Sequence, residues 1–350
     1  MRTITYTSPY VPAEWIAAHG LRPSLVVPGP SAASAPWAYG EGVCPYARAF
    51  AGEVARLPEG GGAIFTTACD QMRRVAELAA GTAHVPVFLM NLPSTWQTAA
   101  AHALYAAELQ RLGRFLVGLG GKPPSPAELA AVMRRHDDAR AALRAARGRL
   151  SPRRHAEAMA AFQRTGVLDL PDPPPAESSA GRGIPVALLG GPLPLEDYRL
   201  FDRVEACGGW VALNATEGGE RTLPAPFDRQ RLQADPFLEL AQAYFGAIPD
   251  VFQRPNHPLF AWLKRELRQS GARGIIIRHY LWCDLWRAEV PRLVEWAGLP
   301  ALHLDAEGGD LPWERTDARL QAFMETLCRR YAATDGQEEM ASPAARQGTA

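Results

Sequence analysis

Short apolar runs, each about the length of one β-strand, alternate with helix-like stretches, and this alternation constrains the fold more than any other feature. In the first hundred residues the runs lie at 3–7, 24–27, 63–67 and 85–90. In the last part of the chain they lie at 184–189, 210–214, 274–280 and 301–305. Strands that alternate with helices are typical of an α/β fold with a parallel sheet. We therefore expect two parallel-sheet α/β domains of the Rossmann or flavodoxin type, with a helical insertion.

The composition along the chain predicts where these domains end. Residues 1–100 form the N-terminal α/β domain, and residues 101–168 carry the periodicity of amphipathic helices. Residues 169–183 are rich in Pro, Ser and Gly, which oppose both helix and strand, so they predict a linker or exposed loop. Residues 184–331 form the C-terminal α/β domain, and the polar residues 332–350 predict a disordered tail.

The helical segment has one clear start signal and one misleading feature. Ser125, with Glu128 three residues later, predicts a helix that begins with a capping box. Several arginines between residues 134 and 154 resemble a nucleic-acid patch, but they alternate with acidic residues and alanines. This pattern is more typical of a solvated helix face.

Charge and hydropathy exclude several classes of partner. Lys+Arg 37 and Asp+Glu 37 give a formal net charge of zero, so no global positive field holds nucleic acid or an anionic membrane. The apolar runs are far shorter than the ~20 residues that a membrane helix needs. No signal peptide is visible at the N-terminus. We therefore expect a cytoplasmic protein with neither nucleic acid nor membrane as a partner.

The five cysteines divide by their position. An odd number is a poor framework for disulfides. Cys44, Cys69 and Cys283 are each expected at a helix N-terminus, where backbone N–H groups stabilise a thiolate. Cys207, at the C-terminus of one expected helix, and Cys328, inside another, are interpreted as structural. The first three suit an anionic metal cluster, and the alternative is that they pack as small buried hydrophobes.

Several segments, in order along the chain, carry a resemblance to a known family. They are PYVPAEWIAAHGLRP (9–23), EGVCPYARAF (41–50), TTACDQMRR (66–74), the helical stretch 106–143, CDLWRAEVPRLVEWAGLPALH (283–303) and RTDARLQAFME (315–325). This series resembles the 2-hydroxyacyl-CoA dehydratase / benzoyl-CoA reductase family of iron–sulfur subunits. The likeness is closest to the D-component type and covers about residues 3 to 330.

The resemblance implies a cofactor and partners. It implies a [4Fe-4S] cluster in the cleft between the two α/β domains, with its iron held by Cys44, Cys69 and Cys283 and with one iron open to a non-cysteine ligand. It also implies a homologous second subunit or a homodimer, and an ATP-dependent iron–sulfur activator protein. In such dehydratases an electron converts the thioester carbonyl of an acyl-CoA to a ketyl radical, which expels the hydroxyl group. In the related aromatic reductases, electrons enter the ring instead.

Two further residues are candidates for catalysis. Glu41, three residues before Cys44, is a candidate acid/base group or a hydrogen-bond partner of the cluster site, and otherwise an exposed loop carboxylate. Ser94 follows a predicted strand and is a candidate donor to substrate, although Ser is also common in turns. The chain has no GxGxxG or Walker loop, so it is not expected to be the ATPase.

Three hypotheses follow. The first is a lyase, namely the iron–sulfur subunit of a 2-hydroxyacyl-CoA dehydratase-type enzyme or of a related low-potential reductase. The second is an electron-relay or reductase protein of the same family that acts on a small non-CoA substrate. The third is a cluster-free interaction subunit in which the cysteines merely pack.

Overall fold

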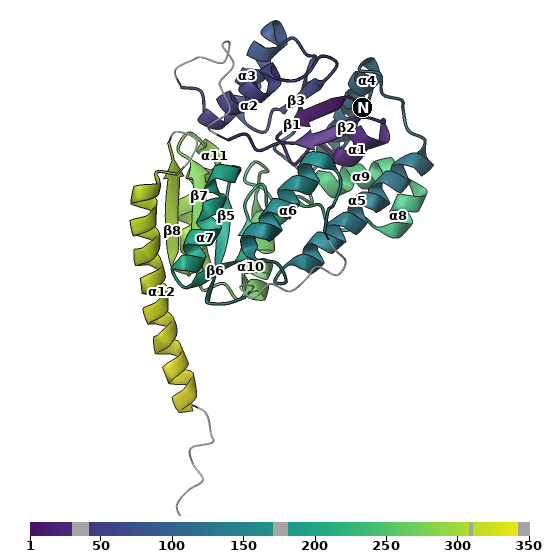
Figure 1. Cartoon of the computed structure of the whole chain (residues 1–350). Coiled ribbons are helices and arrows are strands. Elements are labelled where there is room, and N and C mark those ends of the chain that lie inside the picture. Colours follow the sequence, from purple (N-terminus) through teal and green to yellow (C-terminus); the bar gives the residue numbers. More distant parts are fainter. Residues whose placement is uncertain (30–41, 171–180, 308–310, 342–350) are drawn as a thin grey trace, which may run out of the picture.

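The N-terminal half is built around a four-stranded parallel sheet. The computed structural model describes residues 1–29, 42–170, 181–307 and 311–341 (Figure 1). The sheet has the order β2-β1-β3-β4, with every pair parallel. Its elements are β1 (Thr3–Tyr6), α1 (Ala13–Ala18), β2 (Arg22–Leu25), α2 (Pro45–Ala55), β3 (Gly62–Thr66), α3 (Asp70–Thr82) and β4 (Val87–Met90).

Three long helices follow, as the periodicity predicts. They are α4 (Ala99–Gly118), α5 (Pro126–Ala146) and α6 (Pro152–Thr165). The capping box at the start of α5 is confirmed, because the Ser125 hydroxyl accepts from the Glu128 N–H and the Glu128 carboxylate accepts from the Ser125 N–H. The predicted linker falls mainly on residues 171–180, which lie outside the described residues.

The C-terminal half repeats the architecture of the first. Its parallel sheet has the order β6-β5-β7-β8. The strands are β5 (Ile184–Gly190), β6 (Gly209–Ala215), β7 (Gly274–Tyr280) and β8 (Ala301–Ala306). The helices are η2 (Leu195–Tyr198), α7 (Arg199–Ala206), η3 (Glu220–Thr222), α8 (Arg229–Ala234), α9 (Pro236–Tyr244), α10 (His257–Ser270), α11 (Asp284–Ala297) and α12 (Trp313–Ala341).

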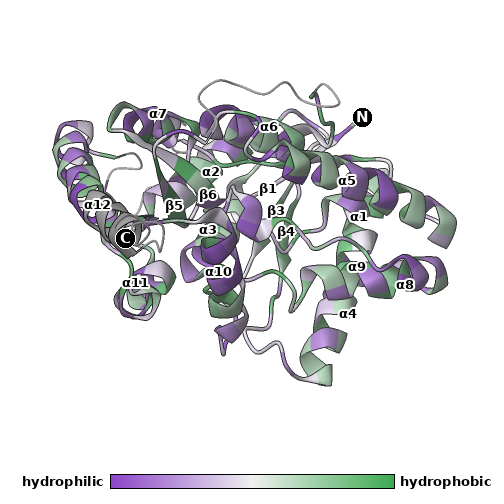
Figure 2. Ribbon diagram, turned by 90° about the horizontal axis from the view of Figure 1, so that it is seen from below, coloured by the Kyte–Doolittle hydropathy of each residue, from purple (hydrophilic) through white to green (hydrophobic). Residues whose placement is uncertain are grey.

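The predicted fold class is confirmed. Each of the eight apolar runs contains or overlaps one strand of the described structure, with small shifts at the ends. Both sheets have the order second-first-third-fourth, so the two halves share one topology. Strands such as β5, β3 and β4 carry mainly hydrophobic residues in the interior, whereas the hydrophilic residues lie on helices such as α8 (Figure 2). This is the pattern of parallel strands buried by helices on both faces.

One glycine is needed where β5 ends beside β7. Gly190 has a φ of +137°, and a Cβ atom there would lie 1.8 Å from the carbonyl oxygen of Arg278. The Arg278 guanidinium is fully buried and pairs with Asp197 at 2.7 Å. Close approach at Gly190 thus brings the ends of the two central strands together beside the point where the strand order reverses.

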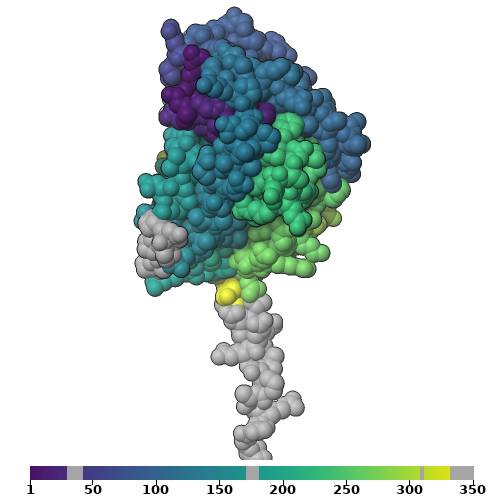
Figure 3. All heavy atoms as spheres, turned by 90° about the vertical axis from the view of Figure 1, so that its right-hand side faces the viewer, coloured from purple at the N-terminus to yellow at the C-terminus, as the bar shows by residue number. Residues whose placement is uncertain are grey.

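A buried polar network joins the two halves through the helical segment. The Arg140 guanidinium of α5 donates to Glu14 of α1 at 2.5 Å, and the Tyr244 hydroxyl of α9 donates to the same carboxylate at 2.6 Å. In Figure 3 the segments around residues 110–150 and 230–250 lie side by side on one face. The expectation of a solvated arginine face is therefore wrong for Arg140, which is 2% exposed, because Glu14 lies 126 positions away in sequence and offers it a buried partner.

The last helix is longer than the sequence predicts. Helix α12 projects from the body of the molecule and continues to Ala341, into the segment for which the composition predicts a disordered tail (Figure 1). Residues such as Gln337, Glu338 and Met340 have high intrinsic helix propensity, which favours a helix in this segment. Residues 342–350 lie outside the described residues.

Candidate active site

Three of the cysteines begin helices, as the sequence predicts. Cys44 is the N-cap of α2, Cys69 of α3 and Cys283 of α11. Local sequence explains the first of these starts, because Pro45 fits the first turn of a helix and has no N–H to satisfy. Cys207 is the C-cap of α7, and Cys328 is exposed on α12, so these two are separate from the others.

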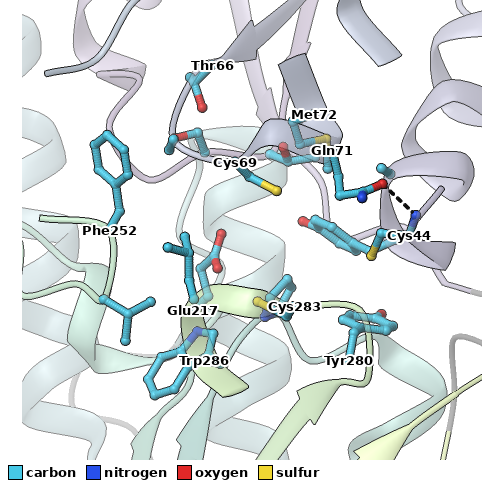
Figure 4. A pocket seen from close by; sticks show the side chains of 18 of the residues that line it. Cys44, Thr66, Cys69, Gln71, Met72, Glu217, Phe252, Tyr280, Cys283 and Trp286 are labelled. Carbon is cyan, nitrogen blue, oxygen red and sulfur yellow. Dashed lines mark hydrogen bonds between the residues drawn. The ribbon is translucent and has the colours of Figure 1, made fainter. Parts of the chain in front are cut away.

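All three N-cap cysteines line one cavity between the two halves. The cavity contains about 770 Å³ of space not filled by protein atoms, including the part open to solvent. Thr7 and Thr66, at the ends of β1 and β3, line it from the N-terminal half, and Tyr280, at the end of β7, lines it from the other. Ligands of open α/β sheets bind at these carboxyl ends, beside the reversal in strand order. Figure 4 shows the sulfur atoms facing the space between the halves.

A side chain fixes two of the helix starts relative to each other. The Cys44 N–H donates to the side-chain oxygen of Gln71 at 2.9 Å (Figure 4). Gln71 lies in the first turn of α3, two positions after Cys69. The bond therefore ties the start of α2 to the start of α3 and holds their cysteines at the same side of the cavity.

Burial dominates the electrostatics of these thiols. It raises the pKa of Cys44 and Cys69, and it raises the pKa of Cys283 to about 12. Backbone N–H groups of the following helical turn oppose this shift, as expected at a helix N-terminus, but their effect is smaller. Without a bound cation the thiols are therefore neutral, and a metal that binds them must displace their protons.

Two carboxylates that the sequence reasoning missed complete the lining. Glu217 is partly buried just after β6, and Asp250 lies in the segment between α9 and α10. Burial, together with the negative charge of Asp250, raises the pKa of Glu217 to about 8, although Arg221 acts in the opposite direction. Figure 4 shows the Glu217 carboxyl group reaching into the cavity between Cys69 and Cys283. The available sequence signal was a carboxylate three positions beyond the predicted strand at residues 210–214, at the ligand-binding edge.

Arg221 explains the placement of Asp250. Its buried guanidinium donates to Asp250 at 2.5 Å and to the carbonyl oxygens of Pro249 and Ala215. Asp250 also accepts from the Phe252 N–H. The charge of Asp250 is thus held in place beside Glu217, rather than free to turn toward solvent.

The rest of the cavity wall is mainly aromatic and apolar. Tyr46 and Tyr280 face each other across the wall with ring centroids 5.6 Å apart. Trp282, half exposed, stands among the lining residues at the solvent side. Among the described residues that line the cavity, none is arginine or lysine. The cavity is thus suited to an uncharged reacting group, and any phosphate would contact the protein elsewhere.

The two other candidates from the sequence are Ser94 and Glu41. Ser94 is exposed and is not among the lining residues, and its carbonyl oxygen accepts from the Arg254 N–H. Glu41 lies outside the described residues. The predicted ligand set of Cys44, Cys69 and Cys283 stays a prediction, but the three side chains do share one cavity.

The chemistry of the donor set fits an iron–sulfur cluster with an open iron. Three thiols converge from separate helix N-termini, and the carboxyl groups of Glu217 and Asp250 line the same cavity. Thiolates are the ordinary protein ligands of such clusters. With three cysteines in the lining, one position of a four-iron cluster would have no cysteine ligand, as in metal sites that keep an open position for substrate.

Comparison with known proteins identifies the family. The family model of the 2-hydroxyglutaryl-CoA dehydratase D-component matches residues 9–327. Among curated proteins, none matches the chain. No helix in the described part of the chain is both long and apolar enough to cross a bilayer. The family model spans nearly all of both α/β halves and includes all three cavity cysteines, and we conclude that the chain belongs to the 2-hydroxyglutaryl-CoA dehydratase D-component family.

Proposed function

We propose that this chain is the subunit of a 2-hydroxyacyl-CoA dehydratase-type enzyme that holds a [4Fe-4S] cluster on Cys44, Cys69 and Cys283. The observation that carries the proposal is that three N-cap cysteines from distant parts of the sequence line one cavity. Cys69 and Cys283 are 214 positions apart (283 − 69). When bound, the cluster would supply the low-potential electron for elimination of water from the acyl-CoA through a ketyl radical. The protein supplies the cavity, the orientation and the exclusion of water.

The side chains of the cavity have separate tasks in this proposal. The aromatic wall, including Tyr46 and Tyr280, excludes water from the reacting thioester. Glu217 holds a proton on its carboxyl group near neutral pH and can deliver it to the departing hydroxyl group. Its buried setting resembles that of other carboxylic acids that act as proton donors.

Metal analysis of a cysteine series tests the ligand set. Protein purified without oxygen should be brown and should contain about four iron atoms per chain. Cys283→Ala should lose most of this iron, because only two thiolates would remain. Cys328→Ala is the matched control, since Cys328 is exposed on α12 and should be dispensable for iron binding.

Two outcomes would contradict the assignment. Full iron retention by Cys283→Ala would exclude Cys283 as a ligand. A colourless wild-type protein after anaerobic reconstitution with iron and sulfide would favour the cluster-free interaction subunit.

Turnover distinguishes the remaining alternatives. The family implies a second subunit, related or identical to this chain, and an ATP-dependent activator, so the assay combines all three with a 2-hydroxyacyl-CoA. Loss of water from the substrate supports the dehydratase. A loaded cluster without acyl-CoA turnover supports an electron-relay or reductase protein that acts on a non-CoA substrate.

A further inference from the structure

A second group of metal-ligating side chains lies in the C-terminal half, outside the cysteine cavity. His279 lies on β7, and His303 and Asp305 lie on the neighbouring strand β8. The strand register places His279 beside Asp305. His303 is two positions before Asp305, so the two side chains share one face of the sheet.

None of these three side chains lines the cysteine cavity. Side chains alternate along a strand, so His279 shares its face with Ile275 and Ile277, which pack with the residues of α10 and α11. Tyr280, which lines the cysteine cavity, belongs to the other face. The histidine cluster is therefore separate from the cavity.

The three ligand atoms converge on one point. The Nε2 atoms of His279 and His303 lie 2.5 Å apart. The Oδ1 atom of Asp305 lies 3.4 Å from the Nε2 of His279 and 3.1 Å from the Nε2 of His303. In the described part of the chain, no other three His, Cys, Asp or Glu side chains bring their ligand atoms within 4.8 Å of one another.

A backbone carbonyl fixes the tautomer of His279. The Nδ1 of His279 lies 2.7 Å from the carbonyl oxygen of Tyr280, which can only accept, so Nδ1 carries the hydrogen. The Nε2, which lies near the ligand atoms of His303 and Asp305, is then the ring nitrogen available to a metal ion. Metal-binding histidines are commonly held by a carbonyl in this way.

The spacing is close to that of a coordination sphere. Metal–ligand bonds of about 2.0–2.1 Å in a tetrahedral site place ligand atoms about 3.3 Å apart. Both distances to Asp305 agree with this value, and the two imidazoles need to separate by about 0.8 Å. The side chain of His303 is 35% exposed and can make this adjustment, whereas the side chain of His279 is almost fully buried and fixed.

We propose that His279, His303 and Asp305 form a binding site for a divalent transition-metal ion of the Zn²⁺ class. Two imidazoles and one carboxylate suit such an ion better than Mg²⁺ or Ca²⁺, which prefer oxygen ligands. Asp305 and His303 are partly exposed, so the ion enters from solvent and water completes its coordination. Arg319 of α12 is tied to the His303 carbonyl oxygen at 2.5 Å and leaves the Asp305 carboxylate available.

Cobalt binding separates this site from the cysteines. The full chain is prepared with Cys44, Cys69 and Cys283 all replaced by Ser, and Co²⁺ is added while the visible spectrum is recorded. We expect one Co²⁺ per chain, with ligand-field bands but no thiolate charge-transfer band. His303→Ala and Asp305→Ala, each made in the triple Cys→Ser protein, remove a direct ligand of the metal. Loss of a residue that only supports a ligand typically weakens metal binding about 10- to 100-fold, so these variants should weaken Co²⁺ binding by more than that. His84→Ala, which removes an exposed histidine of the other half, is the matched control and should bind Co²⁺ unchanged.

Zinc analysis of the cluster-loaded wild-type chain gives a second measurement that does not depend on the triple variant being folded. After incubation with Zn²⁺ and gel filtration, the wild type should retain about one zinc per chain and His303→Ala should retain none. No saturable Co²⁺ binding by the folded triple variant overturns the proposal. Equal zinc retention by the wild type and His303→Ala also overturns it, whatever the state of the cysteines.

Discussion

The raised pKa of Glu217 predicts how the stability of the metal-free protein depends on pH. Glu217 has a pKa of about 8 in the folded protein against an ordinary value of 4.5. Between these values the folded state binds one more proton at this group than the unfolded state does. The free energy of unfolding therefore falls as pH rises from about 4.5 to about 8. Replacing Glu217 by Gln removes this dependence and keeps the shape of the side chain.

The size of the effect follows from the two pKa values. A difference of 8 − 4.5 = 3.5, at about 1.36 kcal/mol for each pKa unit, sets a ceiling of about 5 kcal/mol at pH 8. Solvent that enters the partly open cavity reduces this to about 2–3 kcal/mol. Glu217→Gln should therefore be more stable than the wild type at pH 8, and the two proteins should converge toward pH 5.

Urea unfolding of cluster-free protein at several pH values from 5 to 8 measures this difference. Other groups with shifted pKa values, such as Glu220 and His155, contribute to both proteins and cancel in the comparison. Glu59→Gln is the matched control, because Glu59 is exposed and distant from the cavity lining, and its curve should follow the wild type. Parallel pH curves for the wild type and Glu217→Gln would refute the buried, proton-holding carboxyl group.

Two further predictions concern the helical segment. Arg140→Ala leaves the Glu14 carboxylate buried without its cation, and should lower the free energy of unfolding by about 3–5 kcal/mol, measured with urea at pH 7. Arg140 and His136 help to hold the pKa of Glu14 near 2, against an ordinary value of 4.5, despite its burial. The wild type should therefore lose this contribution progressively as the pH falls from about 4.5 toward 2. An Arg140→Ala protein as stable as the wild type would contradict the network. Ser125→Ala removes the hydroxyl that accepts from Glu128 and should cost about 1 kcal/mol, with faster amide exchange at the start of α5 as the local readout. Unchanged exchange there would mean that the capping box does not stabilise the helix end.

The features that the sequence predicts well are local. A buried parallel strand must be apolar along its whole length, so a run such as residues 274–280 identifies β7 without knowledge of its neighbours. An N-cap depends on a few adjacent residues, so Cys44 before Pro45 and Ser125 before Pro126 are both recognised correctly. The same locality places Cys69 and Cys283 at helix starts.

The features that escape prediction depend on distant partners. Arg140 resembles any other arginine on a polar helix until Glu14, 126 positions away, is packed against it. The cluster of His279 and Asp305 requires the register between β7 and β8, which hydropathy does not determine. Glu217 can be recognised as a site residue only when the two halves are packed together, because only then does it line the same cavity as the three cysteines.

The shared topology of the two halves explains the composition of the site. Cys69 follows β3 and Cys283 follows β7, and these are the corresponding third strands of the two sheets. Cys44 lies on the connection after β2, and Glu217 lies on the connection after β6, the strand that corresponds to β2. Two pairs of topologically equivalent positions thus converge on one cavity, with sulfur at three of the four positions and a carboxyl group at the fourth. If the proposed cluster is bound, a cysteine at that position would close it with a fourth thiolate. A carboxyl group that holds a proton leaves the position open to the substrate oxygen and supplies the acid that its departure requires, so in the proposed function the asymmetry between the halves is what makes the site catalytic.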